Sequence, residues 1–454
     1  MKKIFLIFLF FLTACNDLIN PKPQDGVLAE TYFANTTAAE AGVIAIYNRL
    51  ISRELYLQDR VMAVELLGGN IYPPNKTPPP FHDTYTHNIP TSAQAVFTLW
   101  SSFYTAIGRA NNVLYGIADM KGAEALYGET LFLRALMYFD LMRIYGDVPL
   151  VLEPTQVINL NKIYVKRTPK EEIYKQIVTD LLLAEVLCPS EYATTAATKG
   201  RATKWAAKML LGKVYLYLGK YAESEKKLAE IESSAKFIIA PIQTIFKINN
   251  IPESIWELQI TSNTGHLNSA LLPRNLGGQG QIAVEPNLLK MYENGDLRLT
   301  NYLYKENPPP TPTNQPAPTS ATSVIKYQKN NAFQTDNIMV MRYAETLLIY
   351  AESAARNANA VTEKAVNLLN AIRTRAGLNP KKTTDFANLE AFIDELLWER
   401  RRELIGEFGE TWFDLVRTDK AFDWLKLKSK NLYVIPIPDA ELRNNPNLTQ
   451  NAGY

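Results

Sequence analysis

The chain has 454 residues, of which 48 are lysine or arginine and 46 are aspartate or glutamate. This near balance of charge excludes the dense basic surface that nucleic-acid binding requires, and a total of 2 cysteines excludes a disulfide-rich scaffold. A hydrophobic content of 47% with 11% aromatic residues is typical of a globular chain. The length exceeds what one compact core usually supports, so we expect several domains or a core that grows by stacking helical repeats.

The N-terminus has the pattern of a bacterial lipoprotein signal. Two lysines precede the unbroken apolar run Ile4 to Leu12, which is too short to cross a bilayer. The residues Leu12-Thr13-Ala14-Cys15 resemble a lipobox, in which the cysteine becomes the first mature residue and carries lipid. We therefore expect a signal peptide over 1–14, a lipid on Cys15 that anchors the protein in the membrane, and a lipidated tether over 15–36. The alternative is an ordinary signal peptide followed by an incidental cysteine.

Most of the remaining chain has the apolar spacing of amphipathic helices. Thr168-Pro169-Lys170-Glu171 resembles a capping box, which predicts a helix with Thr168 as its N-cap and Pro169 as its first residue. Further helices are predicted over 38–53, 95–117, 123–144, 204–218, 221–232, 343–357, 362–376 and 389–408.

Two of these segments have the marks of helix pairs. Leu211-Gly212-Lys213-Val214-Tyr215, followed by Gly219, Tyr221 and Ser224, resembles a tetratricopeptide helix-turn-helix, and Tyr343 to Gly377 resembles a second pair. Small residues let paired helices approach closely, while tyrosine and leucine fill the groove between them. The predicted fold is mostly α, a superhelix of tetratricopeptide-like helical pairs overlaid by an irregular, loop-rich domain with short strands.

Two stretches interrupt the helical pattern. The first, about 58–92, is rich in proline, and the second, 233–341, contains a strand-like run at Ser254 to Ile260 and a Pro/Thr/Ser-rich segment. Long loops on a compact scaffold usually serve a function, so we expect the ligand surface to come from these stretches. The predicted organisation is an N-terminal helical scaffold over 37–232, an irregular region over 233–341 and C-terminal helical pairs over 342–454.

Four segments together resemble the SusD/RagB family of outer-membrane nutrient-binding lipoproteins. They lie in the same order as in the family, and the last reaches the C-terminus: Glu129 to Ala135 with Tyr145 to Leu150; Met341 to Glu352 with Asn370 to Gly377; Glu399 to Leu404 with Trp412 to Leu415 and Arg417; and Ile435 to Pro438 with Asn445 to Tyr454. The resemblance implies a lipid-anchored, surface-exposed outer-membrane protein. It also implies that the protein captures an oligosaccharide and passes it to a SusC-like TonB-dependent transporter, over which it sits as a lid.

The sequence carries no constellation typical of catalysis. A total of 3 histidines, none in a zinc or protease motif, is a poor supply for acid/base or metal chemistry. We therefore expect no enzyme activity, no cofactor and no metal. The charged run Glu399 to Glu403 could be read as an active-site cluster, but we interpret it as helix-face ion pairs and a partly buried structural network.

A glycan site needs exposed aromatic rings and polar side chains that bind hydroxyl groups. Five of the 6 tryptophans are assigned to helical stripes, the strand-like run or the C-terminal block, and Trp100 is left open. We therefore predict a ligand site built from the loops, although each residue could instead pack a loop. The aromatic candidates are Tyr72, Phe81, Tyr85, Tyr302 and Tyr304, and the polar candidates are Asn75, His82, Asn268, Arg274 and Gln279.

Two functions from different classes remain open. The first is the uptake lipoprotein that binds oligosaccharides, with peptide cargo as a close variant. The second is a tetratricopeptide-type scaffold that binds only protein partners. A panel of oligosaccharides and peptides distinguishes them, because only the first function requires a small cargo.

Overall fold

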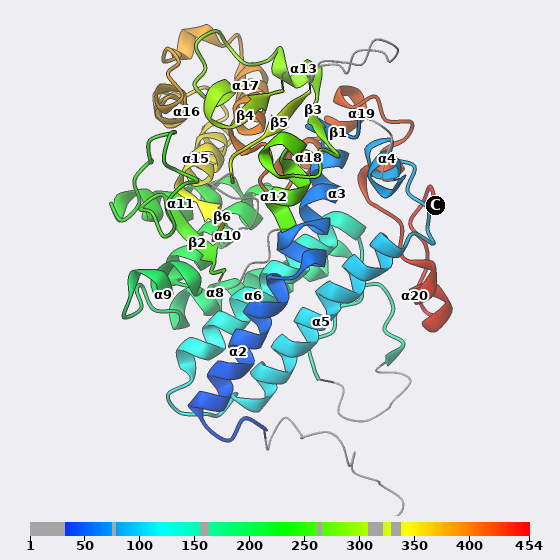
Figure 1. Ribbon diagram of the computed structural model, residues 1–454. Coiled ribbons are helices and arrows are strands. Elements are labelled where there is room, and N and C mark those ends of the chain that lie inside the picture. Colours follow the sequence, from blue (N-terminus) through cyan, green and yellow to red (C-terminus); the bar gives the residue numbers. More distant parts are fainter. Residues whose placement is uncertain (1–31, 75–78, 155–162, 261–265, 307–320, 328–336) are drawn as a thin grey trace, which may run out of the picture.

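The computed structural model describes residues 32–74, 79–154, 163–260, 266–306, 321–327 and 337–454. Cys15 and Asn75 therefore lie outside the described residues, as does the proposed signal peptide. Helices dominate the described part, and the strands are short (Figure 1). This agrees with the mostly α fold expected from the sequence.

The scaffold is a series of long helices in which successive members pack side by side. α5 and α8 pack on α6, α10 packs on α8 and α11, and α15 packs on α11, α16 and α17. Figure 1 shows α2, α5 and α6 in its lower half and α16 and α17 near the top. The bounds are α2 Thr36–Leu50, α5 Gln94–Gly116, α6 Glu124–Tyr145, α8 Lys170–Leu187, α10 Lys204–Tyr217, α11 Tyr221–Ser233, α15 Tyr343–Ala358, α16 Glu363–Arg375 and α17 Leu389–Leu404.

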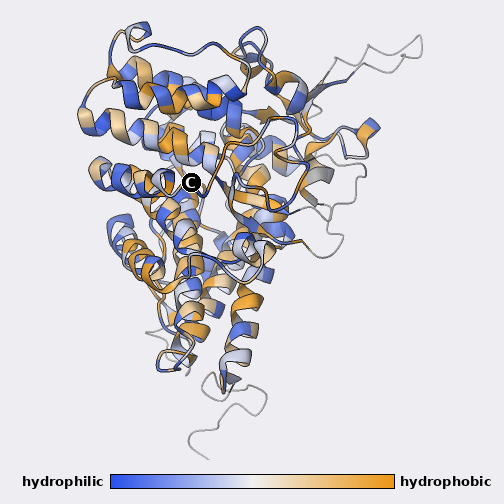
Figure 2. Cartoon of the chain, turned by 90° about the vertical axis from the view of Figure 1, so that its left-hand side faces the viewer, coloured by the Kyte–Doolittle hydropathy of each residue, from blue (hydrophilic) through white to orange (hydrophobic). Residues whose placement is uncertain are grey.

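The outer and inner helices differ as their sequences suggest. α11 buries only Ser224, Leu228 and Ile231, a single narrow stripe, whereas α6 is buried on nearly every side. Figure 2 shows hydrophilic and hydrophobic residues alternating along the helices at the periphery, as expected for amphipathic helices. α6 is thus the central helix of the scaffold, and α2, α5, α8 and α10 all pack on it.

The predicted tetratricopeptide-like pair is confirmed as α10 and α11. A Cβ atom at Gly212 would lie 2.8 Å from Leu228 Cδ2, so the two helices are closer than a side chain at 212 would allow. Ser224 Oγ donates to the Gly212 carbonyl at 2.7 Å and lies 2.8 Å from Ser353 Oγ of α15. Small residues thus join the three neighbouring helices α10, α11 and α15, because they let the backbones meet directly.

The predicted capping box at the start of α8 is wrong. α8 begins at Lys170, and its backbone N–H donates to the carboxylate of Asp147 at 3.0 Å. Thr168 instead pairs with Val148 in an isolated antiparallel β-bridge. The chain therefore uses a carboxylate brought by tertiary structure to cap this helix, which a local pattern cannot reveal.

Helix boundaries at the C-terminal side also differ from the prediction. α17 ends at Leu404 rather than at residue 408, because Gly406 and Gly409 adopt left-handed φ angles of +75° and +69°. A Cβ at Gly409 would lie 2.4 Å from Val64 Cβ. This turn brings the start of α18 (Glu410–Arg417) against α3 (Asp59–Leu67).

The first irregular stretch contains helices that we did not predict. α3 buries seven of its nine residues, including Arg60 and Glu65, so it has no amphipathic stripe that would mark it as a helix. α4 (Pro79–Tyr85) follows at the surface. The short strand β1 (Ile71–Tyr72) lies between them.

The second irregular stretch meets the first through short strands. β1 pairs antiparallel with β3 (Ala283–Val284) of the second stretch. Two further antiparallel pairs are formed, one by β2 (Ser254–Leu258) with β6 (Ile338–Arg342) and the other by β4 (Leu303–Lys305) with β5 (Thr322–Val324). The strand-like run predicted at residue 254 is confirmed. Short helices complete this layer and the C-terminus: α9 Thr195–Gly200, α12 His266–Leu271, α13 Pro286–Leu289, α14 Arg298–Asn301, α19 Ala421–Trp424 and α20 Asp439–Asn444.

The charged run in α17 forms a structural network, as interpreted from the sequence. Glu399 binds Arg298 at 2.7 Å, and Glu403 binds Arg342 at 2.8 Å; these side chains are at most 2% exposed. Burial alone would raise the pKa of Glu403, but the surrounding arginines outweigh this effect and hold it well below its usual value. The network therefore ties α17 to α14 and β6 rather than serving a reaction.

One further cysteine is buried in the scaffold. Cys188 follows α8 and is 3% exposed, and its Sγ would lie 3.1 Å from a Cβ placed at Gly128 of α6. Burial raises the pKa of this thiol well above its usual value. Cys188 is therefore a small hydrophobic packing residue rather than a nucleophile.

Candidate functional site

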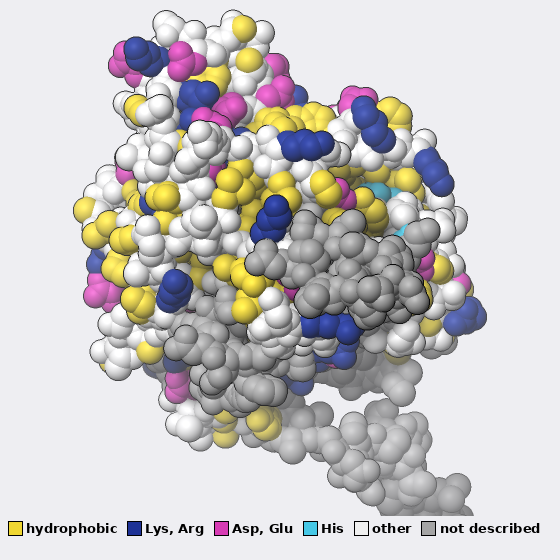
Figure 3. Space-filling model, turned by 45° about the horizontal axis from the view of Figure 1, so that its top comes forward, with side chains coloured by type: hydrophobic (Ala, Val, Ile, Leu, Met, Phe, Trp, Pro, Cys, Tyr) yellow, Lys and Arg dark blue, Asp and Glu magenta, His cyan; other side chains and the backbone are white. Residues whose placement is uncertain are grey.

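A pocket of about 570 Å³ lies where five parts of the chain converge. Its wall comes from the end of α3, the residues after α4, the segment around α13, one face of α17 and the segment 424–432. α4, α13 and α19 lie in the upper right part of Figure 1, at the opposite end of the molecule from the start of α2. Seen from above, this end carries exposed hydrophobic side chains bordered by lysine and arginine (Figure 3).

Two tryptophans form the aromatic part of the pocket. Trp398 of α17 and Trp424 of α19 stack with ring centroids 4.4 Å apart and planes inclined by 17°. Both are only partly buried, although they are large apolar side chains. Stacked, partly exposed indole rings offer the flat apolar surface on which the C–H face of a sugar ring can pack. From the sequence, Trp398 belongs to a helical stripe and Trp424 to the C-terminal block, so neither is among the predicted ligand residues.

The two irregular stretches supply the next wall. The hydroxyl group of Tyr85 donates to Glu285, and the ring of Tyr72 lies 6.3 Å from that of Tyr85. Burial and the neighbouring carboxylate raise the pKa of Tyr85 well above its usual value, so its hydroxyl stays protonated. Tyr85 lines the pocket, and Tyr72 supports it from β1.

His87 lies at the base of this wall, where the chain leaves α4. Its φ of +54° is in the left-handed region, and its ring lies 5.3 Å from that of Trp412. Burial lowers the pKa of His87 to about 4, although a hydrogen bond with the Leu67 backbone acts in the opposite direction. His87 is therefore neutral at physiological pH, and its buried Nδ1 atom makes no hydrogen bond within the described residues.

Arg401 lies one turn after Trp398 and also lines the pocket. Its guanidinium group is centred 5.2 Å from the Trp398 ring, Nε donates to Asn70 Oδ1 at 2.8 Å, and Nη2 donates to the Gly69 carbonyl at 2.5 Å. The residue is 8% exposed. Burial lowers the pKa of Arg401 to about 10, partly offset by Glu285, Tyr292 and Glu65. The site thus holds a desolvated positive charge beside its aromatic surface.

The structure brings some of the predicted site residues together and separates others. Tyr72, Phe81, His82 and Tyr85 cluster at α4 and β1, where Phe81 packs against the core and His82 lies 4.0 Å from Asp83. Tyr304, Arg274 and Gln279 lie in a neighbouring group, in which Asn275 Nδ2 donates to Tyr304 and Arg274 Nε donates to the Gln279 carbonyl. The backbone of Asn268 is in α12, but its side chain is outside the described part.

The prediction that Tyr302 faces a ligand is wrong. Tyr302 is completely buried, and its hydroxyl donates to Glu403 at 3.1 Å within the charge network. A ring enclosed in this way offers no face to a sugar. Trp100, which we left open, is also buried, at 3% exposure.

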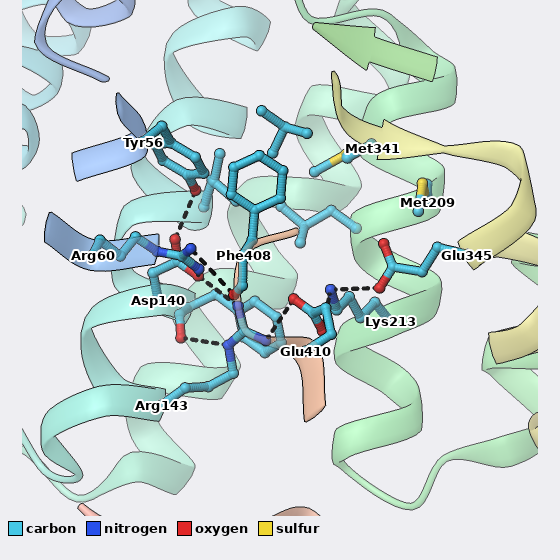
Figure 4. A pocket seen from close by; sticks show the side chains of 14 residues that line it. Tyr56, Arg60, Asp140, Arg143, Met209, Lys213, Met341, Glu345, Phe408 and Glu410 are labelled. Atoms are coloured by element: carbon cyan, nitrogen blue, oxygen red, sulfur yellow. Dashed lines mark hydrogen bonds and ion pairs between the residues drawn. The ribbon is translucent and has the colours of Figure 1, made fainter. Parts of the chain in front are cut away.

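A second, much smaller cavity is lined by a cluster of charged side chains that pair with one another. Tyr56, Arg60 and Arg143 converge on Asp140, and Lys213 bridges Glu345 and Glu410 at 2.8 and 2.7 Å (Figure 4). The cavity among them has a volume of about 20 Å³, room for about one water molecule. It therefore cannot hold a sugar, and its charges compensate one another.

Neither a metal site nor a membrane span is found among the residues that the structure describes. Histidine, cysteine, aspartate and glutamate side chains there form no group of three that could hold a metal ion. No helix in the same ranges is both long enough and apolar enough to cross a bilayer.

Comparison with known families identifies the chain. Residues 57–216 match the family model described as starch-binding and associating with the outer membrane, and residues 290–432 match the SusD family model. The chain belongs to the SusD family. SusD proteins form a carbohydrate-binding family associated with the outer membrane, and the two matches contain the α3, α17 and α19 parts of the candidate pocket.

Similar proteins cover nearly the whole chain. SusD-like protein P38 of Formosa agariphila is 25% identical over 99% of this chain and 98% of its own. A SusD superfamily structure from Parabacteroides distasonis superposes with a TM-score of 0.80 at 25% identity, covering 92% of this chain and 99% of that one. A structure described as a laminarin-binding SusD-like protein superposes with a TM-score of 0.76 at 25% identity, covering 92% of this chain and 100% of that one.

Proposed function

We propose that this SusD-family protein binds an oligosaccharide nutrient at the cell surface in the Trp398–Trp424 pocket. Supporting this proposal, the pocket combines a stacked pair of partly exposed tryptophans with a tyrosine wall and polar side chains. Its volume of about 570 Å³ lies within the range of ligand pockets, about 300–1,000 Å³. The laminarin-binding relative supports a glycan as the cargo.

The bound sugar is then handed to a SusC-like TonB-dependent transporter, with this protein as the lid. A lipid on Cys15 holds the body at the outer membrane on its cell-surface side. The advantage is effective concentration, because cargo held beside a pore enters it without a new diffusional encounter. The pocket catalyses no reaction in this scheme, since uptake needs binding and release.

Isothermal titration of the mature chain against oligosaccharides and short peptides tests this function. The panel includes laminarin, starch, galactan and galacturonan fragments, and we expect heat with at least one of them. Trp424→Ala should weaken that binding about tenfold. Binding heat with peptides alone would mean that the cargo is a peptide rather than an oligosaccharide. Absence of binding heat with every member of the panel, together with tight binding to a co-expressed transporter, would favour the protein scaffold instead.

A further inference from the structure

Arg401 differs from the other buried arginines in lacking an acidic partner. In the described part of the chain nine arginines are buried, and eight of them form an ion pair with a carboxylate. Arg401 forms none there. Its two hydrogen bonds go to neutral acceptors, the Asn70 side chain and the Gly69 carbonyl. A guanidinium group has five N–H donors, so three remain without a partner among the described residues.

The rest of the pocket does not neutralise this charge. The charge of Glu285 raises the pKa of Arg401, but the two side chains are not within ion-pair distance. The carboxylate of Glu285 instead accepts the hydrogen bond of Tyr85. His87 is neutral because burial lowers its pKa to about 4. Lys426 and Lys428 line the same pocket, are exposed, and have no ion pair in the described residues. The lining therefore carries three positive charges against one negative charge.

We propose that the ligand of this pocket is an acidic oligosaccharide whose carboxylate or sulfate group binds Arg401. This inference rests on the proposed function and specifies its substrate class. A buried cation without a counter-ion is costly, so a ligand anion that reaches it gains more than it would in water. The planar guanidinium fork suits a carboxylate or sulfate group, while the tryptophan pair beside it takes the sugar face. Lys426 and Lys428 would attract the same anion from the rim.

Matched ligands test the charge without changing the protein. We would titrate trigalacturonate against its methyl ester, and a sulfated galactan tetrasaccharide against its desulfated form. One acidic member should bind at least tenfold more tightly than its neutral counterpart, and the difference should shrink as salt increases. Which pair shows the preference tells whether the anion is a carboxylate or a sulfate.

Variants then assign the preference to Arg401. Arg401→Gln should lose the acidic preference, whereas Lys426→Gln with Lys428→Gln should reduce it by a few-fold. Because Arg401 also holds Gly69 and Asn70, a melting curve must show that the variant folds. If Arg401→Gln does not fold, Arg401→Lys replaces it; it keeps the charge but loses the planar fork, and it should weaken acidic binding at least threefold.

The outcomes separate this inference from the proposed function. Equal affinity for acidic and neutral members, or binding of neutral sugars alone, overturns the acidic ligand and leaves a glycan-binding protein. A preference that survives intact in the folded Arg401 variant also overturns the assignment to this residue. Absence of binding to every sugar overturns both the inference and the proposed function.

Discussion

The hydroxyl group of Tyr85 donates a hydrogen bond to Glu285, which lies 200 residues later in the chain. This bond joins the two irregular stretches at the edge of the pocket, next to the β1–β3 pairing. The ligand surface is therefore composite: the scaffold helix α17 contributes Trp398, and the loops laid over it contribute Tyr85. Each side of the pocket can be tested by a substitution with a matched control.

Replacing Tyr85 tests the loop side. Tyr85→Ala should weaken oligosaccharide binding about threefold to tenfold, since one aromatic contact is worth about 0.5–1.5 kcal/mol. Tyr304→Ala is the control, because Tyr304 is also a partly buried tyrosine but does not line the pocket. Titration calorimetry measures both. If Tyr304→Ala caused the greater loss, the site would lie at the β4–β5 hairpin instead.

Replacing Trp424 tests the aromatic surface. Trp424→Ala should lower affinity about tenfold, because it removes one ring of the stacked pair. Phe422→Ala is the control, since this aromatic residue lies on the same short helix and is 36% exposed, but is not part of the pocket. Unchanged affinity in the Trp424 variant, with the fold intact by circular dichroism, would contradict the assigned site.

The neutral state of His87 predicts a pH dependence of stability. Its pKa is about 4 in the folded protein against about 6.5 when unfolded, so folding favours the neutral ring. The stabilisation is complete above pH 6.5 and is lost as the pH falls from 6.5 towards 4. His87→Asn, which tolerates the left-handed backbone, should therefore lose less stability over this window, by on the order of 2 kcal/mol.

Urea unfolding of both proteins at pH 7, 5.5 and 4 measures this difference. The buried carboxylates with lowered pKa values act mainly below pH 4.5 and are common to both proteins, so they cancel. Parallel curves for wild type and variant over the window would show that His87 does not titrate there.

The charge network of α17 should respond strongly to loss of one member. Glu403→Gln leaves Arg298, Arg342 and Arg375 with one carboxylate fewer in a fully buried setting. Such a change typically costs about 3–5 kcal/mol of unfolding free energy. Asp419→Asn breaks the exposed pair with Lys430 and should change nothing measurable in the same urea titration. Comparable effects of the two variants would refute the structural role of the buried network.

The lipid anchor can be tested in cells. Cys15→Ser removes the acceptor of the lipid, so the protein should leave the envelope fraction and appear in the soluble fraction. Cys188→Ser should remain with the envelope, because Cys188 is buried at 3% exposure in the folded body. Immunoblots of both fractions give the result. Envelope retention of the Cys15 variant at the wild-type level would argue for another mode of attachment.

The helical scaffold could be predicted because its signals are local. Apolar residues at helical spacing located the long helices, and Gly212 with Ser224 marked a close helix pair. α3 was missed because a helix buried on most sides has no polar face to reveal its period. The start of α8 was missed because its cap, Asp147, comes from elsewhere in the chain.

The candidate site was predicted only in part, for a physical reason. Loop composition located Tyr72 and Tyr85, because exposed aromatic residues in proline-rich segments stand out. Trp398 and Trp424 occupy positions that a core residue would also occupy, and only the packing of the loops leaves part of each ring open. The missing partner of Arg401 is likewise a tertiary property, since its neighbours in the sequence, Arg400 and Arg402, both bind carboxylates.

The buried thiol of Cys188 makes this protein convenient for spectroscopic labelling. Its Sγ is packed between α6 and the end of α8, and its raised pKa keeps it protonated, so maleimide reagents should leave it unmodified. A single cysteine introduced at the exposed position of Asn287, which also lines the pocket, would then be the reactive one on the folded body. A fluorophore attached there would report cargo arrival and release in real time without any change to the scaffold.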